Sequence, residues 1–297
     1  MSSVSRNPAW AFVLPVIAVM IWSLNIVVTR YAADLISPVS ISFYRWLIAF
    51  LILTPFMLGK VWEQRQLIMQ HWLQLAVLSA FGMVLYQGLA YTAAHYTTAT
   101  NMGLINAFIP VFTILVSFFI LKDIPNRFAI MGSILSFCGL IYVMAQGNLS
   151  ALWQSGAHWG DLLMVVAVFF YAFYGVFLKK WQLKIPLLIS LYIQIAFALI
   201  YHLPFIAWLG LDSLNTANLG SVLYAGIFPS LIAPFVWMLA VQQIGPNRTS
   251  IFMNLMPVFT AIIASLWLAE SWTIYHTLGG VLILIGVVMA QKKTCRT

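Results

Sequence analysis

Two long apolar stretches combine polar side chains with helix-disrupting prolines. Asn106 lies four residues before Pro110, and Asn254 lies three residues before Pro257. Inside a helix a proline lacks the N–H that would bond the carbonyl four residues earlier, and in lipid that carbonyl needs another partner. The pattern predicts either two kinked helices whose polar sides face a central cavity, or amides that bond across neighbouring helices. Either arrangement offers hydrogen bonding to a ligand and no bond-breaking chemistry.

Aromatic and polar residues in other apolar stretches would complete the lining of such a cavity. Trp22 and Asn25 are three residues apart, as are Tyr171 and Tyr174, so each pair lies on one helical face. An offset of 149 relates the two pairs. Trp22 falls about halfway along its stretch, too deep for its indole N–H to reach lipid headgroups. The predicted lining also takes in Tyr86, Gln87, Tyr91 and Trp237. The alternative for each aromatic residue is ordinary packing between helices.

Arg45 is the basic residue that lies well inside an apolar stretch. It is seven residues beyond Pro38, where the stretch begins, which is roughly 10 Å deep at 1.5 Å per residue. A charge at that depth is costly and commonly functional. Arg45 would either attract an anionic group of a substrate, such as a carboxylate, or extend outward to bond with helix-end carbonyls.

Several kinds of chemistry are not supported by the sequence. All six acidic residues fall at the ends of apolar stretches or between them, which argues against proton coupling through a central carboxylate: Asp34, Glu63, Asp123, Asp161, Asp212 and Glu270. The five histidines lack paired ligand spacing, and no phosphate-binding G-x-x-x-x-G-K-[ST] loop is present. The basic residues form no aromatic-interleaved patch. We therefore expect no metal, no cofactor, no nucleic-acid partner and no enzymatic activity.

The elements that position these residues are membrane spans. Hydrophobic residues make up 63% of the 297 residues, charged residues 7%, and the mean hydropathy is +0.98, which a soluble globule could not bury. Stretches of ~20 apolar residues, enough to cross a bilayer, occur ten times: 10–28, 38–58, 72–91, 99–121, 128–145, 160–178, 187–208, 219–241, 247–268 and 274–290. The predicted fold class is an all-α integral membrane protein with ten transmembrane helices.

The distribution of positive charge predicts the orientation of these spans. Twelve of the fourteen Lys and Arg residues fall near the N-terminus, in the even-numbered connections, or near the C-terminus. Arg30 alone falls on the other side, and Arg45 lies within a span. Because basic loops stay on the cytoplasmic side, both termini are expected in the cytoplasm.

An internal repeat divides the ten spans into two sets of five. The tetrapeptide 110–113, Pro-Val-Phe-Thr, recurs at 257–260, an offset of 147. Four more identities share that offset: Leu121 with Leu268, Gly132 with Gly279, Leu135 with Leu282 and Gly139 with Gly286. Chance would give roughly two or three of these eight. Since five is odd, the second copy must be inverted, as in many secondary transporters. The predicted boundaries are 1–145 and 159–290 for the repeats, 146–158 for the connection and 291–297 for the tail.

Glycines predict how the last span of each repeat packs. Gly132 and Gly139 are seven residues apart, as are Gly279 and Gly286, so each pair lies on one helical face and lets another backbone approach. The otherwise aliphatic spans 128–145 and 274–290 are therefore expected to be packing elements, with a homodimer interface as a further candidate role.

The chain resembles the EamA branch of the drug/metabolite transporter superfamily over nearly its whole length. Carrying that resemblance are the repeated Pro-Val-Phe-Thr, the Leu-Lys-Asp and Leu-Ala-Glu after it, the Gly-x6-Gly pairs, the 38–45 segment, Gly160-Asp161 and the region of Trp22. Lys122-Asp123 departs from the more usual Gly-Glu. The resemblance implies a carrier of small metabolites in a bacterial inner membrane, often an exporter of amino acids, with a central cavity between the repeats.

These observations together predict a secondary transporter that moves a small polar or amphipathic metabolite by alternating access, with the lipid bilayer as its environment. Export of amino acids or related compounds is the favoured activity. Efflux of drugs or other toxic compounds is an alternative within transport. An intramembrane lipid-handling enzyme is an alternative from another class, and it would need His, Asp or Glu clustered at one depth.

Overall fold

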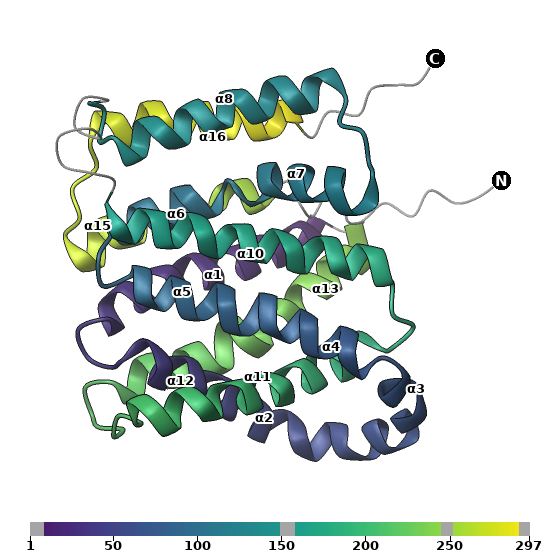
Figure 1. Ribbon diagram of the computed structural model, residues 1–297. Helices are drawn as coiled ribbons and strands as arrows, with labels where there is room; N and C mark the ends of the chain where they lie inside the picture. Colours follow the sequence, from purple (N-terminus) through teal and green to yellow (C-terminus); the bar gives the residue numbers. More distant parts are fainter. Residues whose placement is uncertain (1–8, 149–157, 245–251, 291–297) are drawn as a thin grey trace.

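The computed structural model describes residues 9–148, 158–244 and 252–290, and every regular element in these ranges is helical. The first repeat contains η1 (Ala9–Phe12), α1 (Val13–Ala32), α2 (Pro38–Glu63), α3 (Arg65–Gln70), α4 (Trp72–Ser79), η2 (Ala80–Leu85), α5 (Tyr86–Ala93), α6 (Ala99–Asn106), α7 (Ile109–Leu121) and α8 (Arg127–Met144). The second contains α10 (Trp159–Trp181), α11 (Leu187–Leu209), α12 (Leu219–Ile227), η3 (Phe228–Ile232), α13 (Ala233–Ile244), η4 (Phe252–Leu255), α15 (Met256–Leu268) and α16 (Ile274–Ala290) (Figure 1).

Joined end to end, these elements form the ten predicted spans. In the described ranges, eight stretches are apolar and at least 18 residues long, while Met256–Leu268 and Ile274–Met289 are apolar but shorter. The beginning of the predicted span 247–268 lies outside the described residues. α2 continues to Glu63, beyond the predicted end at residue 58, and the short helix α3 that follows it was not predicted.

Local sequence signals define where several helices begin and end. The side chains of Ser37 and Thr98 accept hydrogen bonds from the backbone N–H groups three residues later, at the starts of α2 and α6. At their other ends, α7 and α15 stop at residues in the left-handed conformation, Lys122 (φ 56°) and Ala269 (φ 53°). These two residues are related by the offset of 147, so the repeat is preserved in the backbone as well as in the sequence.

The packing of α8 against α16 shows that the two repeats are inverted (Figure 1). Gly139 faces the backbone carbonyl of Gly279, and Gly286 faces that of Gly132. A Cβ at Gly139 or Gly286 would lie 2.8 Å or 2.5 Å from those oxygens, so only glycine permits this approach. One residue number rises along the contact while the other falls, which means that the equivalent helices cross antiparallel.

Ser136 and Ile283 mark the symmetry axis between the repeats. The Ser136 hydroxyl donates a hydrogen bond of 2.9 Å to the Ile283 carbonyl, and the two residues are related by the same offset of 147. Equivalent positions can touch only where the twofold axis passes between them. The predicted architecture of two inverted five-helix repeats is therefore confirmed, and the glycine faces of these helices are occupied within the chain.

Helical irregularities also occur in equivalent pairs. The third span of the first repeat contains the π-helical segment η2, and the third span of the second contains η3. The fourth spans are interrupted just before their prolines, at residues 107–108 and at η4. Pro110 and Pro257 then lie in the first turns of α7 and α15. There the missing N–H has no intrahelical partner to lose, so the helices restart instead of kinking through the proline.

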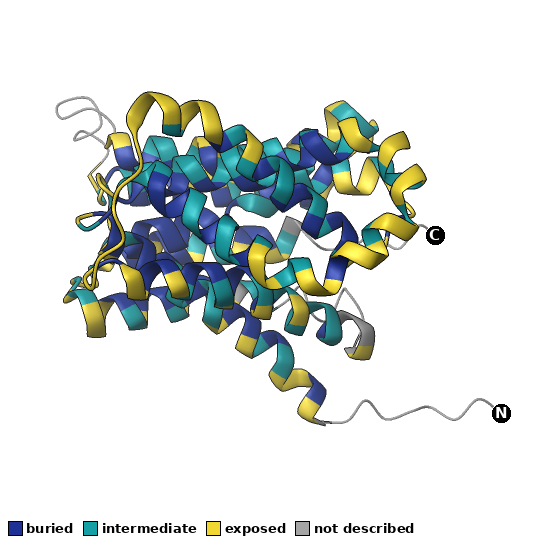
Figure 2. Ribbon diagram, turned by 90° about the horizontal axis from the view of Figure 1, so that it is seen from below, coloured by how far each residue is buried: buried dark blue, intermediate teal, exposed yellow. Residues whose placement is uncertain are grey.

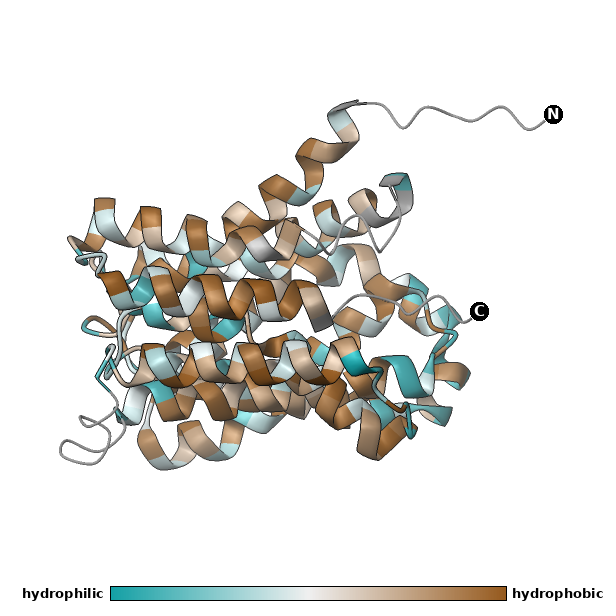
Figure 3. Cartoon of the chain, turned by 90° about the horizontal axis from the view of Figure 1, so that it is seen from above, coloured by the Kyte–Doolittle hydropathy of each residue, from teal (hydrophilic) through white to brown (hydrophobic). Residues whose placement is uncertain are grey.

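Charge and burial distinguish the two ends of the bundle. Seven of the nine described Lys and Arg residues gather where α2 ends and α8 begins, which we call the basic end: Lys60, Arg65, Lys122, Arg127, Lys179, Lys180 and Lys184. The other end of the bundle, which we call the opposite end, carries Asp34, Asp161, Asp212 and Glu270. Buried residues run through the middle of the bundle and exposed ones lie on its outer faces (Figure 2). Hydrophobic residues cover most of the helix length, and hydrophilic ones are most frequent near the helix ends (Figure 3).

Candidate functional site

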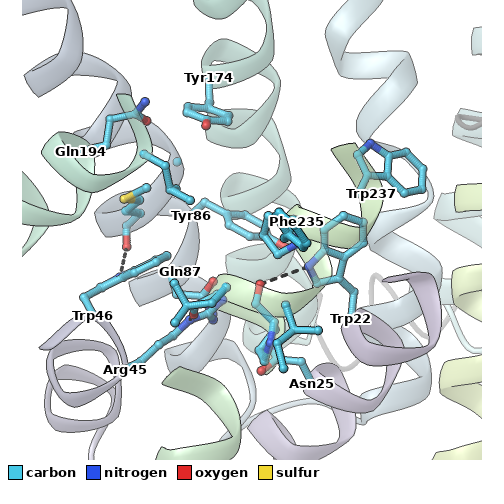
Figure 4. Close-up of a pocket in the computed structure, with 18 of the residues that line it drawn as sticks. Trp22, Asn25, Arg45, Trp46, Tyr86, Gln87, Tyr174, Gln194, Phe235 and Trp237 are labelled. Atoms are coloured by element: carbon cyan, nitrogen blue, oxygen red, sulfur yellow. Dashed lines mark hydrogen bonds between the residues drawn. The ribbon is translucent and has the colours of Figure 1, made fainter. Parts of the chain in front are cut away.

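A cavity of about 900 Å³ lies between the two repeats. Ten of the thirteen residues predicted for a central cavity or as a charge within the membrane line it: Trp22, Asn25, Arg45, Tyr86, Gln87, Asn106, Pro110, Tyr171, Tyr174 and Trp237. Figure 4 shows several of these side chains converging from different helices. The structure thus brings together residues that are up to 215 positions apart in the sequence. That they bind a substrate remains a prediction.

About half of the lining residues form equivalent pairs, one residue from each repeat. The offsets of 147 to 149 relate Trp22 to Tyr171, Asn25 to Tyr174, Arg45 to Gln194, Gly82 to Ser230, Met83 to Leu231, Tyr86 to Pro234, Gln87 to Phe235, Asn106 to Met253 and Ile109 to Met256. The cavity therefore surrounds the twofold axis. Within each pair the residue types differ, so an inverted backbone frame carries an asymmetric set of side chains.

Trp22 finds the partner that its depth requires in the π-helical segment η3. In this segment the Ala233 N–H donates to the Phe228 carbonyl, five residues earlier. By the same spacing the Pro229 carbonyl would pair with Pro234, which has no N–H. The indole of Trp22 donates to that carbonyl instead, at 3.3 Å. Two helices from different repeats are joined across the cavity wall as a result.

The equivalent π-helical segment of the first repeat is also bonded to a tryptophan. The Trp46 indole donates to the Met83 carbonyl, within η2, at 3.1 Å. π-Helical segments are rare and frequently occur at functional sites, because they free backbone groups and re-aim side chains. Both of these segments line the cavity.

A group of aromatic rings forms another wall. The Tyr86 hydroxyl donates to Asn106 Oδ1 at 3.0 Å, and its ring lies 4.7 Å from that of Tyr171. Tyr171 lies 5.5 Å from Tyr174. The ring of Tyr174 packs on Gly82, where a Cβ would lie 2.7 Å from the nearest ring carbon. Trp22 pairs similarly with Trp237, at 5.4 Å. The cavity thus presents flat apolar surfaces with a few hydrogen-bonding groups, as small-molecule sites do.

Arg45 is buried within the bundle, only 5% exposed, and it does not extend outward. Its Nε donates to Ser230 Oγ at 2.7 Å, and Nη1 lies 3.4 Å from the Tyr91 hydroxyl. Its guanidinium carbon lies 4.8 Å from the centre of the Trp46 ring. Arg45 is therefore a fixed positive charge in the wall of the cavity.

Of the other three predicted residues, two stand apart from the lining and one is not described. Tyr91 is buried behind Arg45, and Pro257 is buried in the first turn of α15. The side chain of Asn254 lies outside the described residues. Sequence reasoning missed Gln194, although the offset of 149 from Arg45 would have identified it. It also missed Trp46, Ser230, Phe235 and five methionines, Met57, Met83, Met238, Met253 and Met256.

A carboxylate closes the bundle at the opposite end. Glu270 follows α15 and accepts hydrogen bonds from three groups at the start of α6: the backbone N–H of Ala99 (2.8 Å), the backbone N–H of Thr100 (3.0 Å) and the Thr100 hydroxyl (2.7 Å). A negative charge at a helix N-terminus is also favoured by the helix dipole. The two repeats are joined here by an interaction that uses the first helical turn of α6.

A second polar cluster lies beside this contact. Asp161, 1% exposed, accepts hydrogen bonds from the Thr97 hydroxyl and from Asn101 Nδ2, the latter at 3.2 Å. Asn101 Oδ1 lies 3.2 Å from His276 Nε2. Asp161 lies in the first turn of α10 and ties this helix to α6. These contacts hold α6, α10 and α16 together at the opposite end.

The cavity extends from Arg45 toward the basic end. Its lining includes Phe56 and Met57, near the end of α2, and Leu187 and Leu188, in the first turn of α11. Phe56 is 67% exposed and Leu187 is 55% exposed. Their exposure gives the cavity a side opening on the outer surface of the bundle. Within residues 9–148, 158–244 and 252–290, no group of three His, Cys, Asp or Glu residues is placed to hold a metal ion.

Comparison with known proteins agrees with this architecture. Residues 9–145 and 158–291 each match the EamA-like transporter family. An uncharacterized transporter from Archaeoglobus fulgidus is 28% identical over 93% of this chain and 96% of its own length. The uncharacterized transporter YyaM from Bacillus subtilis is 24% identical over 88% and 87%.

A solved structure shares the fold. The crystal structure of another protein aligns with this chain with a TM-score of 0.61 at 17% identity, over 95% of this chain and 96% of the other. The family is one of transporters rather than enzymes. Two family matches, one on each five-helix repeat, show that this chain belongs to the EamA-like transporter family.

Proposed function

We propose that this membrane protein is a secondary transporter that works by alternating access and exports amino acids or related small metabolites. The observation that carries this proposal is that a cavity on the twofold axis is closed at one end and extends toward the other. Glu270 and Asp161 seal the opposite end, while the cavity reaches the basic end. If these contacts broke and equivalent contacts of the other repeat formed at the basic end, the cavity would open to the other side of the membrane.

The proposed orientation follows from charge. If the basic end is cytoplasmic, as the positive-inside rule predicts, both termini lie in the cytoplasm of a bacterial inner membrane. The cavity then extends toward the cytoplasmic side, from which an exporter loads its substrate. We also propose that residues 1–145 and 159–290 are the two functional halves, with 146–158 and 291–297 as connection and tail.

Amino acids fit the cavity's composition. Aromatic rings and methionines provide apolar walls, and methionine side chains adapt to different shapes. Arg45 and the amides of Asn25, Gln87, Asn106 and Gln194 supply the polar groups. A dimer through α8 and α16 would use their outer faces, because their glycine faces already pack on each other.

Efflux of amphipathic drugs is the second candidate function. The exposed side chains of Phe56 and Leu187 at the side opening favour it, because a compound dissolved in lipid could enter there. Competition would separate the two activities. If the protein carries amino acids, unlabelled amino acids inhibit its uptake of a labelled amino acid. If it exports drugs, amino acids leave its efflux of an amphipathic dye unaffected.

The proposal is tested by flux into proteoliposomes over a panel of labelled amino acids, with and without a pH gradient. Trp22→Ala and Asn106→Ala should each reduce flux at least tenfold, because they remove a cavity wall and a hydrogen-bonding amide. Trp208→Ala is the matched control, since Trp208 is 82% exposed and lies outside the cavity. Flux that is unchanged in both cavity variants would rule out this site, and flux of no compound would rule out the function.

A further inference from the structure

We infer that Arg45 is the anion-binding residue of the cavity, and that the transported molecule carries a carboxylate group attached to an apolar body. This inference rests on the proposed transport function and specifies its substrate class. It starts from a positive charge that has no negative partner in the part of the chain that the structure describes.

Among the described residues, no carboxylate compensates Arg45. In the described part of the chain, the ion pairs are Arg30 with Asp34 and Lys179 with Asp123. Asp161, Asp212 and Glu270 receive their hydrogen bonds at the opposite end, and Glu63 is exposed at the basic end. A buried cation without a counter-ion is costly within a membrane. A substrate carboxylate would supply the missing charge while it is bound.

The contacts of Arg45 orient its guanidinium toward the cavity. Ser230 donates its own hydroxyl proton to the Ala225 carbonyl at 2.7 Å, so it can only accept from Arg45 Nε. One Nη1 proton is directed to the Tyr91 hydroxyl. A guanidinium has five N–H donors, so three are left to bind a ligand in the cavity that Arg45 lines. Its planar fork matches the two oxygens of a carboxylate.

Two residues that line the same cavity each carry a buried oxygen without a hydrogen-bond donor, and these oxygens add to the description of the ligand. Asn25 Oδ1 and Gln194 Oε1 are buried and have no hydrogen-bond partner among the described residues. Gln194 is 2% exposed, and its amide nitrogen donates to Ser190 Oγ at 3.0 Å. A buried carbonyl oxygen without a donor is also costly. A ligand with an ammonium or amide N–H group in addition to its carboxylate would supply a donor to such an oxygen and a negative charge to Arg45.

Arg45 and its equivalent Gln194 make the two ends of the cavity differ in charge. These residues occupy equivalent positions of the two repeats, yet only one is charged. Arg45 lies roughly 10 Å from the start of α2, at 1.5 Å per residue. The start of α2 is at the opposite end of the bundle, where the cavity is closed. The carboxylate is therefore held at the closed end, and the apolar body lies among the aromatic and methionine walls toward the opening.

Binding to the purified full-length protein in detergent tests this inference, measured by calorimetry with three acid and amide pairs. The probes are 3-phenylpropionate, L-phenylalanine and L-leucine, each compared with the amide in which –COO⁻ is replaced by –CONH₂. We expect the wild-type protein to bind at least one acid ten or more times more tightly than its amide. If no acid is preferred to its amide, the inference is overturned, and this result needs no variant.

Two variants assign the preference to Arg45. Arg45→Gln, which gives α2 the residue found at the equivalent position of α11, should remove the preference, and Arg45→Lys should retain part of it. Arg30→Gln is the matched control, because Arg30 pairs with Asp34 and does not line the cavity. A preference that survives in Arg45→Gln overturns the assignment. If Arg45→Gln does not fold, as judged by size-exclusion chromatography, a preference in Arg45→Lys equal to that of the wild type overturns it instead.

The same probes separate this inference from the proposed function. Wild-type protein that carries amino acids into vesicles but binds acids and amides equally would refute the anion site and leave transport standing. Wild-type protein that prefers the acids but moves none of them across a membrane would keep the site and refute transport.

Discussion

Replacing Glu270 by glutamine should loosen the closed end of the bundle by an amount that the structure lets us estimate. The carboxylate accepts two backbone N–H bonds and one hydroxyl bond at the start of α6. A hydrogen bond to a charged group contributes roughly 1.5–3 kcal/mol, and a charge at a helix N-terminus roughly 0.3–1 kcal/mol. Glutamine keeps an acceptor oxygen but loses the charge, so we expect local opening to become easier by about 2 kcal/mol.

Hydrogen exchange at the amides of Ala99 and Thr100 measures this opening directly. These two N–H groups are the donors to Glu270, so they exchange when the contact breaks. A change of about 2 kcal/mol corresponds to about 30-fold faster exchange, at 1.4 kcal/mol per factor of ten. The measurement is mass spectrometry of peptides covering residues 94–104 in Glu270→Gln and in the wild type.

Asp123→Asn is the matched control for that experiment. Asp123 follows α7 as Glu270 follows α15, but it forms an exposed ion pair with Lys179 at 2.8 Å at the basic end. An exposed pair contributes roughly 0–1 kcal/mol, so exchange at residues 99 and 100 should not change. Unchanged exchange in Glu270→Gln, or an equal acceleration in Asp123→Asn, would refute the view that Glu270 holds this end closed.

Three further predictions concern stability, each measured by thermal unfolding in detergent. Gly286→Ala should lower the unfolding temperature by overpacking equivalent to about 1–3 kcal/mol, because a Cβ there would lie 2.5 Å from the Gly132 carbonyl; Gly220→Ala, in open space, should not. Trp22→Phe should cost about 1–3 kcal/mol, because the Pro229 carbonyl loses its donor, and equal stability in Trp22→Phe and Trp208→Phe would contradict this. Hydrogen bonds from the Ser37 hydroxyl and backbone N–H hold the pKa of Asp212 below its ordinary value. This contact therefore stabilises the protein above the ordinary carboxyl pKa of about 4 and loses its effect as the pH falls through the lowered pKa. As the pH falls below about 4, the wild type should lose stability by a margin that Asp212→Asn lacks.

Much of the architecture could be predicted because the relevant signals are local in the sequence. The length of each apolar stretch predicts a span, and the repeated Pro-Val-Phe-Thr and Gly-x6-Gly patterns indicate the duplication. The odd number of spans per copy then requires inversion. Ten cavity residues were also predicted, because polar or aromatic groups deep in a span stand out against an aliphatic background.

The missed features depend on which helix faces which. Trp46 lines the cavity, yet nothing in its own span distinguishes a cavity-facing residue from one in the protein interior. The two π-helical segments were not foreseen, because they arise where carbonyls freed from the regular pattern meet tryptophans of other helices. The position of Tyr91 behind Arg45 is likewise a matter of helix packing.

The sequence alone determined the number of spans, their inverted duplication and the presence of a charge at the depth of Arg45, since apolar length, repeat offset and residue type belong to the chain itself. The tertiary structure decided which faces turn toward the cavity, which end is closed and which groups close it. The physical reason is the solvent: lipid and protein interior are equally apolar, so hydrophobic patterning does not separate the outside of a membrane helix from its inside. Close packing and the pairing of polar groups make that choice, and they involve residues far apart in the chain.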